Sequence, residues 1–145
     1  MKDIHIAIIG AGIGGMTAAV TLAQKGLKVN VFEQAPELSE VGAGLTVTPN
    51  ATKGLIYLGL GQAMEKIGMA HELQGVRHYQ TKEMIVPLKR GKHMLEKYGA
   101  YQFQVHRADI HDILIENLEK YSPGCVSVDH QLVGIDQKSD RVKLI

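Results

Sequence analysis

A glycine-rich turn lies between an apolar run and an amphipathic segment near the start of the chain. The apolar run covers residues 4–9 and is rich in isoleucine, which is typical of a strand buried in a parallel sheet. It stops at the Gly-Ala-Gly-Ile-Gly-Gly sequence of residues 10–15. Residues 16–25 then place apolar side chains at helical spacing, and Val29, Val31 and Phe32 form a second predicted strand. These segments predict a β-α-β unit.

Each position in this turn has its own physical role. Gly10 permits the tight turn out of the strand, Gly12 removes a side chain that would hold a phosphate away from the backbone, and Gly15 lets the helix pack closely on the strand. The N–H groups of Ile13, Gly14 and Gly15 lie at the positive end of the predicted helix. This arrangement predicts a binding site for the pyrophosphate of a dinucleotide.

Glu33 follows the second predicted strand of the unit. A carboxylate at the carboxyl end of that strand can accept hydrogen bonds from ribose hydroxyls, and it repels the 2′-phosphate of NADP. The pattern therefore favours FAD or NAD in this site, and the fingerprint alone does not choose between them.

The remaining chain predicts an α/β fold: a Rossmann-like parallel sheet with helices, plus small antiparallel strands. Pro49 is placed to open a helix, and no internal repeat or linker is present. Strands are predicted at 45–48, within 79–89, and at 101–105, 126–128, 132–135 and 142–144, and helices at 49–58, 62–67 and 109–118.

Composition excludes several classes of function. The 145 residues carry 16 basic and 15 acidic side chains, a balance that argues against a nucleic-acid partner. Cys125 is the single cysteine and the histidines are scattered, so neither a disulfide nor a metal cluster is predicted. The run at 4–9 is too short to span a membrane and lacks the features of a signal peptide. A cytoplasmic protein without a membrane partner is expected.

Four segments together resemble the FAD-dependent aromatic-ring monooxygenases, in the salicylate and 6-hydroxynicotinate hydroxylase branch. They are residues 10–33, the Gly42-to-Leu45 segment with the Pro-Asn-Ala sequence at 49–51, the Leu-Gly-Leu sequence at 58–60, and the His-Arg-Ala-Asp-Ile-His sequence at 106–111. The last segment discriminates best, because NAD dehydrogenases have no counterpart. The resemblance implies FAD as cofactor, NAD(P)H as co-substrate, and a small aromatic substrate that reacts with O₂.

The resemblance also assigns roles to individual residues. The arginine of the fourth segment contacts FAD in the family, which gives that role to Arg107. Glu33 is implied at the adenosine ribose with Gln34 close by, and Leu132 is implied to contact the adenine side through its backbone. A guanidinium close to a helix N-terminus also favours an anion on physical grounds.

Gly44 and the residues after it are implied to lie near the isoalloxazine ring. A histidine approaches the substrate there in the hydroxynicotinate enzyme, whereas this chain has Thr46, which argues against the same substrate. No residue of the chain needs to act as acid or base, since the flavin carries the chemistry.

Residues 1–145 are expected to be the N-terminal part of an FAD-binding domain. Two family motifs, an Asp-Gly pair and a Gly-Asp pair, would follow Ile145, as would the substrate domain, so a larger two-domain flavoprotein is expected and the chain alone would be inactive. Three alternatives stay open: another FAD-dependent oxidoreductase such as a reductase or epoxidase, an NAD-dependent dehydrogenase domain, and a non-catalytic dinucleotide-binding or structural fragment. The oligomeric state is not predicted.

Overall fold

The computed structural model describes residues 4–39 and 43–145. The chain divides into two compact units, one made of Met1–Glu40 with His111–Ile145 and the other of Val41–Ile110. The helix α5 (Arg107–Glu119) begins in the second unit and ends in the first. None of the helices in the described part of the chain has the length and apolarity needed to cross a bilayer.

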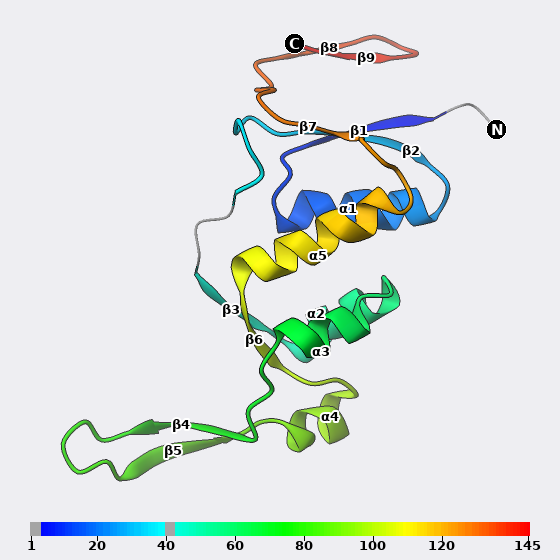
Figure 1. The fold of residues 1–145 in the computed structure, drawn as a ribbon. Helices are drawn as coiled ribbons and strands as arrows, with labels where there is room; N and C mark the ends of the chain where they lie inside the picture. The colour runs from blue at the N-terminus through cyan, green and yellow to red at the C-terminus, as the bar shows by residue number, and fades with distance from the viewer. Residues whose placement is uncertain (1–3, 40–42) are drawn as a thin grey trace. The chain divides into compact units, whose positions relative to one another are not determined.

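The first unit contains the predicted β-α-β arrangement (Figure 1). Strand β1 (His5–Ile9) leads through the glycine-rich turn into α1 (Ile13–Gln24), and β2 (Lys28–Phe32) returns parallel to β1 with Ile8 opposite Val31. The short strand β7 (Val126–Ser127) pairs in parallel with β2, so the strand order is β1-β2-β7. The prediction of an α/β fold with a parallel sheet is confirmed.

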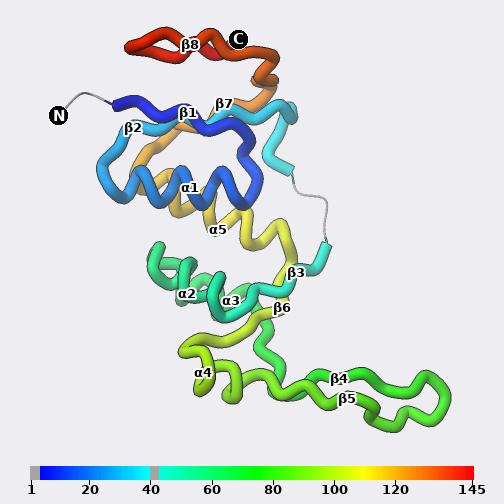
Figure 2. The backbone as a smooth tube through the Cα atoms, turned by 180° about the vertical axis from the view of Figure 1, so that it is seen from behind, coloured from blue at the N-terminus to red at the C-terminus, as the bar shows by residue number. Residues whose placement is uncertain are grey.

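Both helices of this unit lie on one side of the sheet (Figures 1 and 2). Their buried faces and β2 form the core, in which six side chains are fully shielded from solvent: Met16, Ala19, Val20, Val31, Leu114 and Leu118. A hairpin of β8 (Ile135–Gln137) and β9 (Val142–Leu144) lies on the other side of the sheet (Figure 1). The core of this unit therefore lies between the sheet and the two helices.

Three details of the sequence prediction are corrected in this unit. Strand β1 was expected to be buried, yet Ile4 beside it is 58% exposed and Ile9 is 45% exposed, because β1 is an edge strand with helices on one face only. Helix α1 begins at Ile13 rather than residue 16, since Gly12 occupies its N-cap. The strand predicted at 132–135 begins only at Ile135, because the N–H groups of residues 133 and 134 both donate to one carbonyl, that of Ile145.

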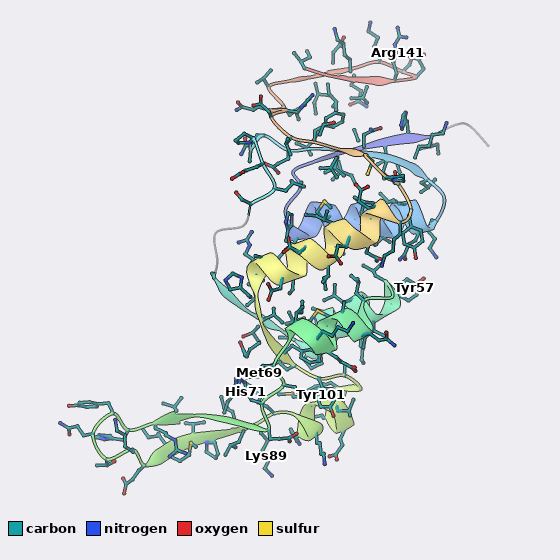
Figure 3. All side chains as sticks on the ribbon, viewed as in Figure 1. Tyr57, Met69, His71, Lys89, Tyr101 and Arg141 are labelled. Atoms are coloured by element: carbon teal, nitrogen blue, oxygen red, sulfur yellow. The ribbon has the colours of Figure 1, made fainter. Side chains whose placement is uncertain are left out.

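The second unit is built from small antiparallel pairs and short helices. Strand β3 (Gly44–Val47) pairs with β6 (Phe103–His106), and β4 (Leu73–Arg77) pairs with β5 (Met84–Lys89). The helices α2 (Pro49–Tyr57), α3 (Gly61–Ile67) and α4 (Lys92–Tyr98) complete it. Large apolar side chains remain at its surface, among them Tyr57 and Met69, which Figure 3 labels.

The sequence predicted most of this unit's elements and missed two. The small antiparallel strands and the helices α2 and α3 are confirmed. Strand β4 and helix α4 were not predicted, because neither segment shows clear apolar periodicity: β4 contains Gly75 and α4 buries only Met94. Helix α5 starts at Arg107, two residues before the predicted start, so the arginine is the first residue of the helix.

Candidate cofactor-binding site

The turn between β1 and α1 presents an open helix N-terminus. Gly10 has a φ of +93°, a conformation that favours glycine, and its N–H donates to the Phe32 carbonyl at 2.7 Å. Gly12 is the N-cap, and the first helical hydrogen bond runs from the Met16 N–H to the Gly12 carbonyl at 2.9 Å. The N–H groups of residues 13–15 therefore lie outside the helical ladder and are available to an anion.

The glycines of the turn divide into two kinds. A Cβ on Gly12 or Gly14 would meet nothing within 4 Å, so both positions border open space. A Cβ on Gly15 would lie 1.9 Å from the Gly10 carbonyl oxygen and 3.4 Å from Cγ2 of Ile8. The prediction that Gly15 serves close packing of helix on strand is confirmed, whereas the space beside Gly12 and Gly14 fits a ligand that touches the backbone.

The carboxylate of Glu33 is held beside this turn by two hydrogen bonds from backbone N–H groups. Its Oε2 accepts from the Ala11 N–H at 2.7 Å, and its Oε1 accepts from the Ala35 N–H at 3.0 Å. The bond from Ala35 and then the bond from Ala11 lower the pKa of Glu33, with smaller contributions from the Gln34 N–H and His111, while partial burial opposes them. Each carboxylate oxygen keeps a second lone pair, so Glu33 can still accept ribose hydroxyls.

We expect Glu33→Gln to lower the free energy of unfolding of the cofactor-free protein by about 1 kcal/mol or less near neutral pH. The amide oxygen can accept only one of the two N–H bonds, and the amide nitrogen faces the other N–H. Because the folded pKa is depressed, the carboxylate's contribution is complete above its unfolded pKa of about 4.3 and is lost as the pH falls through the folded pKa.

Urea unfolding at neutral pH and in acid measures this difference. Glu37→Gln is the matched control, because Glu37 lies on the same loop and is exposed. A stability difference between Glu33→Gln and the wild type that persists below the folded pKa would contradict the expectation.

Two other predicted residues lie beside Glu33. A cavity of about 260 Å³ is lined by Gln34 and Leu132 together with the following residues: Ile9, Gly10, Phe32, Glu33 and His130. The His130 ring packs against the Phe32 ring with centroids 5.9 Å apart. The structure thus brings Glu33, Gln34 and Leu132 together at the carboxyl ends of β1 and β2, where α/β folds bind ligands.

The remaining predicted residues lie in the second unit. Gly44 pairs with His106 in the β3–β6 ladder, and the Arg107 N–H donates to the Ala43 carbonyl at 3.0 Å, so Gly44 and Arg107 share one end of that ladder. The Thr46 hydroxyl donates to the Gln104 side-chain carbonyl at 3.0 Å. Gly42, part of the same sequence motif, lies outside the described residues.

His111 is a buried residue at the turn that sequence analysis did not single out for the site. Its Nε2 lies 2.5 Å from the Ala11 carbonyl oxygen, and with Glu33 it lines a second cavity, of about 140 Å³. No sequence signal marks this contact, because 100 positions separate the two partners. No group of His, Cys, Asp and Glu suited to a metal ion occurs among residues 4–39 and 43–145.

A model of the family described as "FAD binding domain" matches residues 3–144. The 6-hydroxynicotinate 3-monooxygenase of Pseudomonas fluorescens is 41% identical over 114 residues, which cover 79% of this chain and 30% of that protein. The 3-hydroxybenzoate 6-hydroxylase 1 of Aquipseudomonas alcaligenes is 36% identical over 141 residues, which cover 97% of this chain and 36% of that protein. The chain therefore spans about a third of the length of these relatives.

Solved structures extend the similarity to the fold. The crystal structure of Klebsiella pneumoniae HpxO complexed with FAD and uric acid superimposes with a TM-score of 0.83 at 28% identity. The match covers 97% of this chain and 34% of that chain. The similarity therefore includes both units of the present chain, each of which has its counterpart in one longer protein.

Proposed function

The chain belongs to the FAD binding domain family, and on this premise we propose that it forms the FAD-binding part of an NAD(P)H-dependent monooxygenase that hydroxylates an aromatic or heteroaromatic acid. The observation that carries the proposal is the turn at residues 10–15, where a helix N-terminus with bare backbone at Gly12 and Gly14 adjoins the carboxylate of Glu33. The residues present fit FAD, since two glycines leave the backbone open where a pyrophosphate would lie.

We assign the parts of FAD to residues as follows. The N–H groups of Ile13, Gly14 and Gly15 would hold the pyrophosphate, and Glu33 would accept the ribose hydroxyls. Gln34 and the Leu132 backbone would border the adenosine in the cavity that they line. FAD, when bound, would supply the redox chemistry that uses NAD(P)H and O₂ to hydroxylate the ring.

Gly44, Thr46 and Arg107 form the second group of proposed site residues. Arg107 would add positive charge against the cofactor, and the bare backbone of Gly44, where a Cβ would meet nothing within 4 Å, would allow the flavin ring to approach. Thr46 would face the substrate side and present a hydroxyl instead of an imidazole. The role that we propose for this chain is to bind and orient the cofactor.

The family match favours this function over an NAD-dependent dehydrogenase domain. Another FAD-dependent oxidoreductase would use the same residues for the cofactor and would differ in its substrate. Since the chain spans about a third of its relatives, turnover is a property we assign to the full-length protein that contains it.

Cofactor identity tests the proposal directly. We expect the full-length protein to purify yellow and to release FAD on heating, because the proposed site would hold a pyrophosphate and an adenosine ribose, and FMN lacks both. Chromatography of the released flavin identifies it. Release of FMN, or no flavin bound after saturation with FAD, would refute the proposal, whereas FAD bound without hydroxylation of any aromatic acid would refute only the activity.

Arg107→Ala should weaken FAD binding to the full-length protein by about 1.5–3 kcal/mol, the range for a hydrogen bond to a charged group. Arg141→Ala is the control, because Arg141 is an exposed arginine in the turn between β8 and β9 (Figure 3). Flavin fluorescence titration measures both dissociation constants. Equal affinities for FAD in the two variants would show that Arg107 does not contact the cofactor.

A further inference from the structure

The buried imidazole of His111 contacts the backbone of the glycine-rich turn. The side chain projects from α5, is 3% exposed, and places Nε2 2.5 Å from the Ala11 carbonyl oxygen. A carbonyl oxygen can only accept, so Nε2 carries the proton and donates. The hydrogen bond ties α5 to the turn within the first unit of the chain.

Ala11 is held from both sides. Its N–H donates to Oε2 of Glu33 at 2.7 Å, its carbonyl accepts from His111, and the residue itself is 1% exposed. Both neighbours of Ala11, Gly10 and Gly12, are glycines, the residue type with the greatest backbone freedom. Without the two hydrogen bonds to Ala11, the turn would therefore adopt several orientations.

The bond from His111 also fixes an N–H group on the opposite side. The Ala11 carbonyl and the Gly12 N–H belong to one peptide unit, and in a trans peptide these two groups point in opposite directions. When the carbonyl points to the buried imidazole, the Gly12 N–H points away from it. A Cβ on Gly12 would meet nothing within 4 Å, so the glycine is bordered by open space.

We propose that His111 is a positioning residue for the dinucleotide site: by holding the Ala11 carbonyl, it keeps the Ala11–Gly12 peptide in the orientation that receives the pyrophosphate. This inference rests on the proposed FAD site and adds a residue that does not touch the cofactor. Without the imidazole N–H, the peptide can rotate, and the fraction of molecules competent to bind falls. The apparent dissociation constant rises by the inverse of that fraction.

Two substitutions at this position separate the N–H group from the bulk of the ring. His111→Phe keeps a planar ring and removes the donor, whereas His111→Gln keeps an N–H₂ group at a similar distance from the backbone. His5→Phe, on an exposed position of β1 in the same unit, is the matched control. In the full-length protein, titration with FAD and with ADP gives the dissociation constants, and thermal unfolding without ligand gives the stability.

We expect His111→Phe to weaken FAD and ADP binding by the same factor, about 5- to 10-fold, corresponding to one hydrogen bond. The two dissociation constants of His111→Gln should stay within about twofold of the wild-type values, and His5→Phe should leave both constants unchanged. A folded His111→Phe protein with wild-type affinity for both ligands would overturn the proposal. A His111→Gln protein that binds FAD and ADP as weakly as His111→Phe would also overturn it.

A purely structural role would lower the melting temperature of His111→Phe and leave the affinity of its folded fraction unchanged, which also overturns the proposal. If His111→Phe does not fold, His111→Gln is compared instead with His111→Asn, whose side chain is shorter. Weaker binding of FAD and ADP is then expected only for His111→Asn. A wild-type protein that binds neither FAD nor ADP would refute the proposed function itself. FAD bound equally by all variants would refute only the role of His111.

Discussion

Replacing Gly15 by alanine is expected to lower the free energy of unfolding of the cofactor-free protein by more than about 3 kcal/mol. The added Cβ would lie 1.9 Å from the Gly10 carbonyl oxygen, a backbone atom that cannot move aside as a flexible side chain would. Relief requires α1 to move away from β1, which would disturb the packing of Met16, Ala19 and Val20, all fully buried. A close-packed core resists such a shift.

Gly14→Ala is the internal control for this prediction. Gly14 lies in the same helical turn, its Cβ would meet nothing within 4 Å, and alanine is favoured over glycine in a helix by about 1 kcal/mol. We expect Gly14→Ala to match or exceed the wild-type stability in urea unfolding. Equal stabilities of the Gly14 and Gly15 variants would show that helix and strand are not in the close contact described for Gly15.

The first part of the fold could be predicted because its signals are local. The isoleucine-rich run, the glycine spacing and the helical periodicity after it all occur within 33 residues, and each specifies the next step of the β-α-β unit. The role of Gly15 in packing followed from the same spacing, since a helix that turns back onto its own strand needs a residue without a side chain at the contact. Helix α2 was predicted from Pro49, which occupies its first turn.

What could not be predicted depends on contacts between distant parts of the chain. The bond of His111 to Ala11 requires α5 to pack beside the turn, and no periodicity in either segment reports that approach. Glu33 was predicted to accept ribose hydroxyls, but its bonds to the N–H groups of Ala11 and Ala35 depend on how the chain turns after β2. The exposure of Ile9 likewise depends on which elements cover each face of the sheet.

Gly12→Ala should give the opposite result from Gly15→Ala, with FAD binding lost and folding kept. The backbone at Gly12 has φ −66° and ψ 177°, which alanine adopts without strain, and its Cβ would meet nothing within 4 Å. The preference for glycine over alanine at an N-cap limits the loss of stability to about 1 kcal/mol. The methyl group would instead occupy the space where we place the pyrophosphate.

We therefore expect the FAD dissociation constant of the full-length Gly12→Ala protein to rise by at least about 100-fold, equivalent to about 3 kcal/mol, while its unfolding without cofactor stays close to the wild type. Paired titration and urea unfolding on the same preparation separate the two quantities. Gly26→Ala is a useful contrast, because Gly26 follows α1 with a φ of +75° at the end of the helix away from the turn. The Gly26→Ala protein should be less stable, whereas the FAD affinity of its folded fraction should not change. A Gly12→Ala protein that binds FAD like the wild type would place the pyrophosphate elsewhere and would remove the central support for the proposed site.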